Sequence, residues 1–156
     1  MEQEAAALAQ AVGDALSEAD YRVMNLLGIQ LEAITPHSAT CTMTVRDDMV
    51  NSHQYCHGGL IFTLADHAFA YACCASNLTG VTLSANILYA QPAHLKDQLT
   101  AVAQVINQSG RSGHCEVTVT NQNQALIARY QGVWYRLQQK IVERGEIERR
   151  EERSEQ

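Results

Sequence analysis

The chain has 156 residues, of which 46% are hydrophobic and 18% charged, and its formal net charge at pH 7 is −6. This length predicts one globular domain with a substantial core. The negative charge, without a basic stripe interleaved with aromatic residues, argues against nucleic acid as the main partner.

Neither a membrane partner nor secretion is expected. No run reaches the roughly 20 apolar residues that cross a bilayer. The first residues, M-E-Q-E-A-A-A, lack the basic segment of a secretory signal. The cysteines form no regularly spaced pairs, and free thiols predict a cytoplasmic protein. They are Cys41, Cys56, Cys73, Cys74 and Cys115.

The first half of the chain predicts two helices with β-structure between them. Residues 2–19 are rich in Ala, Glu and Leu and predict a peripheral helix, to which we assign residues 1–21. From Leu31 to Arg46 polar and apolar residues alternate, as in half-buried strands. After a polar loop, His57–Ser76 is too long for a strand and apolar around most of a helix, which predicts a buried helix.

The second half predicts an antiparallel run of strands. Four β-like runs are separated by turn signals: Val81–Tyr89, Gln98–Asn107, Gly113–Thr120 and Ala125–Leu137. This order predicts an α+β fold over residues 22–137, in which a curved antiparallel sheet wraps one long buried helix. Arg and Glu alternate in the tail, residues 138–156, which predicts a solvated helix or a frayed end.

The stretch N-S-H-Q-Y-C-H-G-G-L-I-F-T-L-A-D, residues 51–66, is the strongest candidate for chemistry. Gly58 and Gly59 open the buried helix, whose first N–H groups have no partners within the helix. No Ser, Thr, Asp or Asn directly precedes them to cap these donors. Such donors can polarise a carbonyl or hold an anion, and Asp66 adds a carboxylate on the same helix.

Asn51, His57, Gly58, Gly59 and Asp66 together form a pattern that resembles the hotdog-fold acyl-CoA thioesterases of the phenylacetate-pathway type. The resemblance covers about residues 24–137 and includes S-A-N-I-L-Y-A-Q-P-A. It implies a hotdog fold and a thioester hydrolase that acts on acyl-CoA. It implies no cofactor, because coenzyme A is part of the substrate.

The resemblance also implies roles for single residues. The Gly58 N–H, aided by Gly59, would polarise the thioester carbonyl, and Asp66 would act as general base or as nucleophile. Asn51 would orient the water or the carboxylate. His57 would hold the loop or bond near the thioester sulfur. Thr82 would contact water near Asp66, as a Ser or Thr does in some relatives.

Helix geometry predicts a dimer. Gly58 and Asp66 are eight residues apart, or about 12 Å along one helix. A reacting carbonyl must lie within about 3 Å of both its donor and the attacking oxygen. Two copies with antiparallel helices across a two-fold axis satisfy this requirement. Family members often pair such dimers into tetramers.

Coenzyme A and the acyl group have less distinct sites. The turn at Gly110, Arg111 and Ser112 offers a cation, a hydroxyl and a flexible backbone that suit a phosphate, although a plain hairpin turn explains it equally well. The acyl tunnel is expected to be lined by Phe62, Phe69 and Tyr71 of the helix, and by strand residues 81–89.

Other functions fit the residues less well. His53, Cys56 and His57 lack a fourth ligand and a recognised spacing, so no metal is expected. Cys56 as a nucleophile lacks a partner base. A hydratase of the same fold would need a His several residues after its Asp, whereas His67 is adjacent to Asp66 and points about 100° away. A non-catalytic acyl-CoA sensor remains an alternative.

Overall fold

The computed structural model describes residues 1–154, so the last two residues of the predicted tail lie outside the described part. The helices are α1 (Glu2–Ala19), α2 (Tyr21–Leu27), α3 (Gly58–Cys74) and α4 (Arg144–Ser154), with a short 3-10 helix, η1 (Asp47–Met49). The strands are β1 (Gln30–Thr35), β2 (Ser38–Thr44), β3 (Gly80–Tyr89), β4 (Gln98–Ser109), β5 (Ser112–Thr120) and β6 (Leu126–Arg136).

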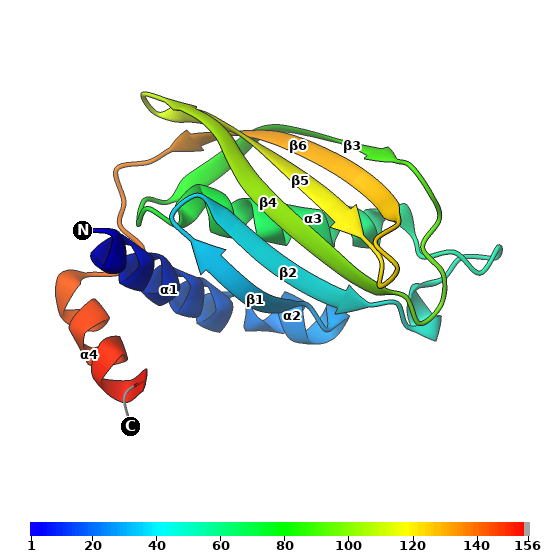
Figure 1. Cartoon of the computed structure of the whole chain (residues 1–156), viewed down its shortest axis with the longest axis horizontal. Helices are drawn as coiled ribbons and strands as arrows, with labels where there is room; N and C mark the ends of the chain where they lie inside the picture. The colour runs from blue at the N-terminus through cyan, green and yellow to red at the C-terminus, as the bar shows by residue number, and fades with distance from the viewer. Residues whose placement is uncertain (155–156) are drawn as a thin grey trace.

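A curved antiparallel sheet with strand order β1-β2-β4-β5-β6-β3 wraps around α3 (Figure 1). The predicted α+β hotdog architecture is therefore confirmed. Alternate strand residues face the helix, and Ala101, Ala103, Val117 and Val119 are fully buried there. Small side chains on β4 let α3 lie close to the sheet, with larger ones on β5 filling the remaining space.

Two glycines set how closely the aromatic core packs on the sheet. A Cβ on Gly132 would lie 2.6 Å from the Phe69 ring, and a Cβ on Gly113 would lie 2.2 Å from the Trp134 ring. Real Cβ atoms do not approach other atoms this closely, so both positions require glycine. Because Phe69 belongs to α3 and Gly132 to β6, this contact holds the middle of the helix against that strand.

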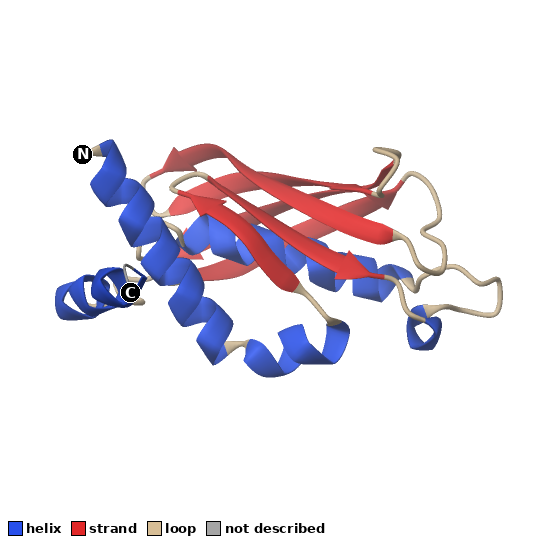
Figure 2. Cartoon of the chain, turned by 60° about the horizontal axis from the view of Figure 1, so that its bottom comes forward, coloured by secondary structure: helices blue, strands red, loops and turns tan. Residues whose placement is uncertain are grey.

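The two N-terminal helices cover the flank of the sheet beside β1 (Figure 2). Ala9 and Val12 of α1 are fully buried. The Tyr71 hydroxyl of α3 lies 2.8 Å from Ser17 Oγ and 3.1 Å from Met24 Sδ, so one residue of α3 is bonded to both N-terminal helices. No helix within residues 1–154 is long and apolar enough to span a membrane.

The C-terminal segment is less solvated than its composition predicts. Val142 is 1% exposed. Asn77 holds it: Asn77 Oδ1 accepts the N–H groups of Ile141 and Val142 at 3.0 and 2.9 Å, and Asn77 Nδ2 donates to the Val142 carbonyl at 2.9 Å. The expectation of a solvated tail is therefore wrong at this point, because a side chain distant in sequence supplies the bonds.

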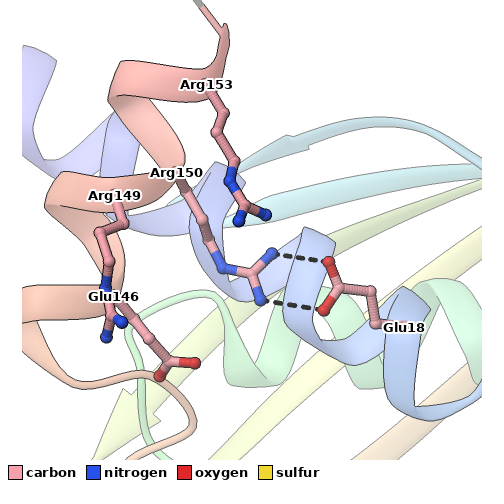
Figure 3. A pocket seen from close by; sticks show the side chains of 5 residues that line it. All are labelled: Glu18, Glu146, Arg149, Arg150 and Arg153. Atoms are coloured by element: carbon pink, nitrogen blue, oxygen red, sulfur yellow. Dashed lines mark hydrogen bonds and ion pairs between the residues drawn. The ribbon is translucent and has the colours of Figure 1, made fainter.

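Helix α4 is highly charged and packs against α1 at an angle (Figure 1). Arg150 donates two hydrogen bonds, of 2.9 and 3.0 Å, to the carboxylate of Glu18 (Figure 3). This hydrogen bond and the positive charge of Arg150 lower the pKa of Glu18. Glu18 is exposed and Arg150 is partly exposed, so the pair adds little to stability and serves mainly to orient α4.

Candidate active site

The loop before α3 is held by backbone bonds on both sides. The Cys56 N–H donates to the Ala93 carbonyl at 2.8 Å, and the His57 N–H donates to the Met49 carbonyl at 2.9 Å. His57 occupies the position that precedes the helix, and no side chain caps the helix there. These backbone bonds fix the position of the loop, and the N–H donors at the start of α3 remain available to a ligand.

The two glycines differ in their surroundings. The Tyr89 hydroxyl, at the end of β3, donates to the Gly58 carbonyl at 2.6 Å. A Cβ on Gly58 would lie 2.9 Å from Cζ of that ring, so Gly58 is needed for the close approach of Tyr89. A Cβ on Gly59 would meet nothing within 4 Å, so this side of the helix start is open.

Asp66 lies two turns along α3 and is partly buried. The Tyr130 hydroxyl of β6 donates to Asp66 Oδ1 at 2.8 Å. This bond leaves Oδ2 as the oxygen that can act on a substrate. Tyr130 was not among the residues predicted from the sequence, because the contact joins positions 64 residues apart.

Tyr130 is itself fixed by aromatic neighbours. Its ring is 1% exposed and packs at centroid distances of 5.2 Å from Phe62 and 5.4 Å from Phe69. Burial, followed by the hydrogen bond to Asp66, raises the pKa of the Tyr130 hydroxyl. The hydroxyl therefore stays protonated and acts as a donor to the carboxylate.

Asn51 shapes the loop in this structure. Its Oδ1 accepts the N–H groups of His53 and Tyr55 at 2.9 and 3.1 Å, an arrangement typical of Asx turns. Its Oδ1 is thus engaged within the loop, and the predicted role of Asn51 in orienting water or the carboxylate stays a prediction. The His57 side chain is exposed beside the helix start. Asn51, His57 and Gly58 thus lie together, whereas Asp66 lies two helical turns away.

Thr82 lies apart from Asp66 of its own chain. It pairs with Trp134 across β3 and β6, four residues along β6 from Tyr130, which is about 13 Å at strand spacing. It is exposed on β3. The predicted contact with water near Asp66 therefore does not arise between groups of one chain.

The proposed phosphate turn joins β4 to β5. Gly110 has φ +58°, in the left-handed region that glycine favours. The Arg111 guanidinium lies 3.4 Å from the Tyr135 hydroxyl. This hairpin lies at the end of the sheet opposite the loop that leads to Gly58 (Figure 1). Within one chain, Arg111 and Gly58 therefore cannot bind the same small molecule.

Two predicted tunnel residues are core residues instead. Phe69 and Tyr71 are 1% and 3% exposed. Phe69 packs between Tyr130 and Trp134, and Tyr71 bonds to the N-terminal helices. The error arose because the apolar sequence of α3 does not reveal which of its faces meets the sheet.

Cys56 does not have the properties of a nucleophile. Burial raises the pKa of its thiol to about 11, so the thiolate is scarce at neutral pH. Among residues 1–154, no group of three or more His, Cys, Asp or Glu side chains is placed to hold a metal ion.

The chain is similar to known thioesterases. A family model described as the thioesterase superfamily matches residues 53–128. Acyl-coenzyme A thioesterase PaaI of Escherichia coli (strain K12) is 40% identical over 111 residues, 71% of this chain and 79% of that protein. The structure of E. coli PaaI from the phenylacetic acid degradation operon matches at TM-score 0.84 and 36% identity, over 86% of this chain and 97% of that one.

A hypothetical thioesterase from Streptococcus pneumoniae TIGR4, solved with coenzyme A, matches at TM-score 0.69 and 25% identity, over 72% of this chain and 88% of that one. The chain therefore belongs to the thioesterase superfamily, a class of hotdog-fold thioester hydrolases. Within that class it is similar to the PaaI type, and the resemblance inferred from the motif is confirmed.

Proposed function

We propose that this protein hydrolyses an acyl-CoA thioester to the free acid and CoA, with Gly58 of one subunit and Asp66 of the partner subunit acting on one carbonyl. The observation that carries this proposal is helix α3, which presents uncapped N–H donors at its start and an oriented carboxylate two turns later. The E. coli relative is named an acyl-CoA thioesterase, and the pneumococcal relative was solved with coenzyme A, which supports this substrate class.

The reaction needs a polarised carbonyl and an activated oxygen. The N–H of Gly58, with that of Gly59, donates to the thioester oxygen and stabilises the negative charge that develops there. Asp66 Oδ2 removes a proton from water as the water oxygen bonds to the carbonyl carbon. The intermediate then collapses, the C–S bond breaks, and the departing thiolate takes up the proton.

Direct attack by Asp66 is the second route, through a mixed anhydride that water then hydrolyses. A single turnover in ¹⁸O-water, followed by mass spectrometry of the peptide that contains Asp66, tests this route. Label in the Asp66 carboxylate supports direct attack, with water adding at the Asp66 carbon of the anhydride. Label in the released acid alone shows that water adds at the acyl carbon, as the general-base route requires.

The spacing of the two groups and the free edge of the sheet support a dimer. Within residues 1–154, β3 pairs only with β6, so its other edge has no strand beside it. Leu83 and Leu88 of β3 are 61% and 67% exposed. An exposed, apolar edge strand is a surface at which a second copy can extend the sheet. A two-fold axis there would place the α3 helices antiparallel, and pairing of such dimers would give the tetramer.

The proposed dimer would also bring the phosphate turn toward the site. In one chain, Arg111 and Gly58 lie at opposite ends of the sheet, and antiparallel pairing would direct the turn of one copy toward the Gly58 end of the other. We propose that Gly110, Arg111 and Ser112 hold a phosphate of CoA there. The free, buried cysteines accord with the cytoplasmic location that we propose.

The alternatives are a hydratase and a sensor of the same fold. His67 Nδ1 lies 3.0 Å from the Thr63 carbonyl, and its Nε2 lies 2.9 Å from Asp20 Oδ2, so this ring is directed toward the N-terminal helices. It does not form an acid–base pair with Asp66, which disfavours the hydratase. Asp66→Asn tests the sensor alternative. If the protein is an enzyme, the variant loses hydrolysis and keeps acyl-CoA binding. If it is a sensor, the unmodified protein already shows no hydrolysis.

Hydrolysis of a panel of aromatic, medium-chain and long-chain acyl-CoA esters tests the activity and identifies the acyl group. The shared site is tested by mixing Gly58→Ala and Asp66→Asn chains under conditions that exchange subunits. Each heterodimer has one site with both groups intact, so about a quarter of the wild-type rate is expected from a statistical mixture. No recovery in proven heterodimers would contradict the shared site.

A further inference from the structure

Two tyrosine hydroxyls contact the two reactive parts of α3. Tyr89 donates to the Gly58 carbonyl at 2.6 Å, and Tyr130 donates to Asp66 Oδ1 at 2.8 Å. The first comes from β3 and the second from β6, which are adjacent strands of the sheet. We propose that Tyr89 and Tyr130 are positioning residues, an inference that rests on the function proposed above. Tyr89 positions the amide donors of one subunit, and Tyr130 positions the carboxylate that acts in the site shared with the partner subunit.

Tyr89 acts on the peptide group that joins Gly58 to Gly59. The carbonyl of Gly58 and the N–H of Gly59 belong to one planar unit, so a bond that fixes the carbonyl also fixes the direction of that N–H. A donor on the carbonyl also polarises the unit and makes its N–H a stronger donor. No side chain caps the start of α3, so that N–H is left to donate to a thioester oxygen.

Tyr130 acts on the charge and the direction of Asp66. A donor to a carboxylate favours its ionised form, and a bond to Oδ1 fixes the plane in which Oδ2 lies. The Tyr130 ring is held between Phe62 and Phe69, so the hydroxyl has a defined place. The titratable groups that face Tyr130 are Asp66 and Cys73 of α3 and Cys115 of β5.

The two substitutions have different kinetic signatures. Tyr130→Phe is expected to lower kcat about tenfold, the loss for one hydrogen bond to a charged group, with KM little changed. The acidic limb of its kcat/KM profile should move to higher pH, because the carboxylate loses a donor that favours its ionised form. Tyr89→Phe should lower kcat severalfold and leave that limb in place, because its partner is an uncharged peptide.

Tyr21→Phe is the matched control. Tyr21 is an exposed residue of α2 and should keep the wild-type rate and profile. A Tyr130→Phe enzyme that is folded by circular dichroism and keeps the wild-type kcat and acidic limb would overturn the role of Tyr130. A wild-type kcat for Tyr89→Phe would overturn that of Tyr89. If the wild type hydrolyses no acyl-CoA, the proposed function fails instead.

A second measurement applies if Tyr130→Phe does not fold. Replacement of all six tyrosines by 3-fluorotyrosine keeps each ring and makes each hydroxyl a stronger donor. The acidic limb should then move to lower pH, because a stronger donor favours the ionised carboxylate further. A limb that stays in place would refute the proposal for Tyr130.

Discussion

Gly58→Ala should separate activity from stability, because the added methyl group meets a side chain that can move. The new Cβ would lie 2.9 Å from Tyr89 Cζ, whereas carbon atoms pack at about 3.5 Å or more. The ring tip must therefore retreat by about 0.6 Å, and the 2.6 Å hydrogen bond to the Gly58 carbonyl lengthens to about 3.2 Å. Tyr89 is 45% exposed, so it can swing toward solvent.

The two effects on stability have opposite signs. Loss of one neutral hydrogen bond costs about 1 kcal/mol. Alanine in place of glycine in a helix raises the free energy of unfolding by about 0.5–1 kcal/mol. We therefore expect the free energy of unfolding in urea to change by less than about 1 kcal/mol. Turnover should fall at least tenfold, because loss of one oxyanion donor costs about 10²–10³ in kcat and here the donors are displaced.

The measurements are urea unfolding followed by circular dichroism and the hydrolysis rate at saturating acyl-CoA. Gly59→Ala is the control for stability, because its Cβ would meet nothing within 4 Å. A Gly58→Ala protein with wild-type turnover would refute the reasoning about the helix start. A loss of more than about 3 kcal/mol would show that Tyr89 cannot move aside.

Three further predictions concern the rest of the molecule. Gly113→Ala should destabilise the protein by about 3 kcal/mol or more in urea, because its Cβ would lie 2.2 Å from the immobile, buried Trp134, and a smaller loss would contradict this packing. Asn77→Ala should expose the segment around Val142 to limited proteolysis, and an unchanged cleavage pattern would show that other contacts hold it. Burial raises the pKa of Cys41 to about 12, so its thiol ionises only in the unfolded chain above about pH 9. Cys41 alone should therefore lower the free energy of unfolding by about 1.4 kcal/mol per pH unit from pH 9 toward 12, and Cys41→Ala should reduce the overall slope by that amount.

The elements of the fold could be predicted because their signals are local. Four β-like runs became β3 to β6 with ends shifted by at most two residues, and the apolar segment from His57 became α3. The region from Leu31 to Arg46 contains two strands, β1 and β2, joined by a tight turn. The motif H-G-G predicted the start of α3, because the paired glycines, the lack of a capping residue before them and the apolar run after them are all visible in the local sequence.

The contacts that organise the site could not be predicted in this way. Tyr89 and Tyr130 are 31 and 64 positions from their partners, and although Tyr89 lies in the stretch S-A-N-I-L-Y-A-Q-P-A, nothing in either sequence position indicates the contact. Their placement depends on strand register and on how closely α3 approaches β6, which Gly132 and Phe69 determine. The burial of Val142 likewise depends on a side chain 65 positions away. Pairing between distant segments is a property of the packed structure.

The free edge of β3 also bears on how weakened variants will behave in the laboratory. If the protein forms the dimer proposed above, a protomer without its partner leaves the outer edge of the ten-residue strand β3, with its exposed leucines, open to pairing with other strands. Substitutions that loosen self-association should thus lower soluble yield during expression before they produce a well-behaved inactive monomer. A larger share of the expressed protein in the insoluble fraction would be the first sign that self-association is weakened.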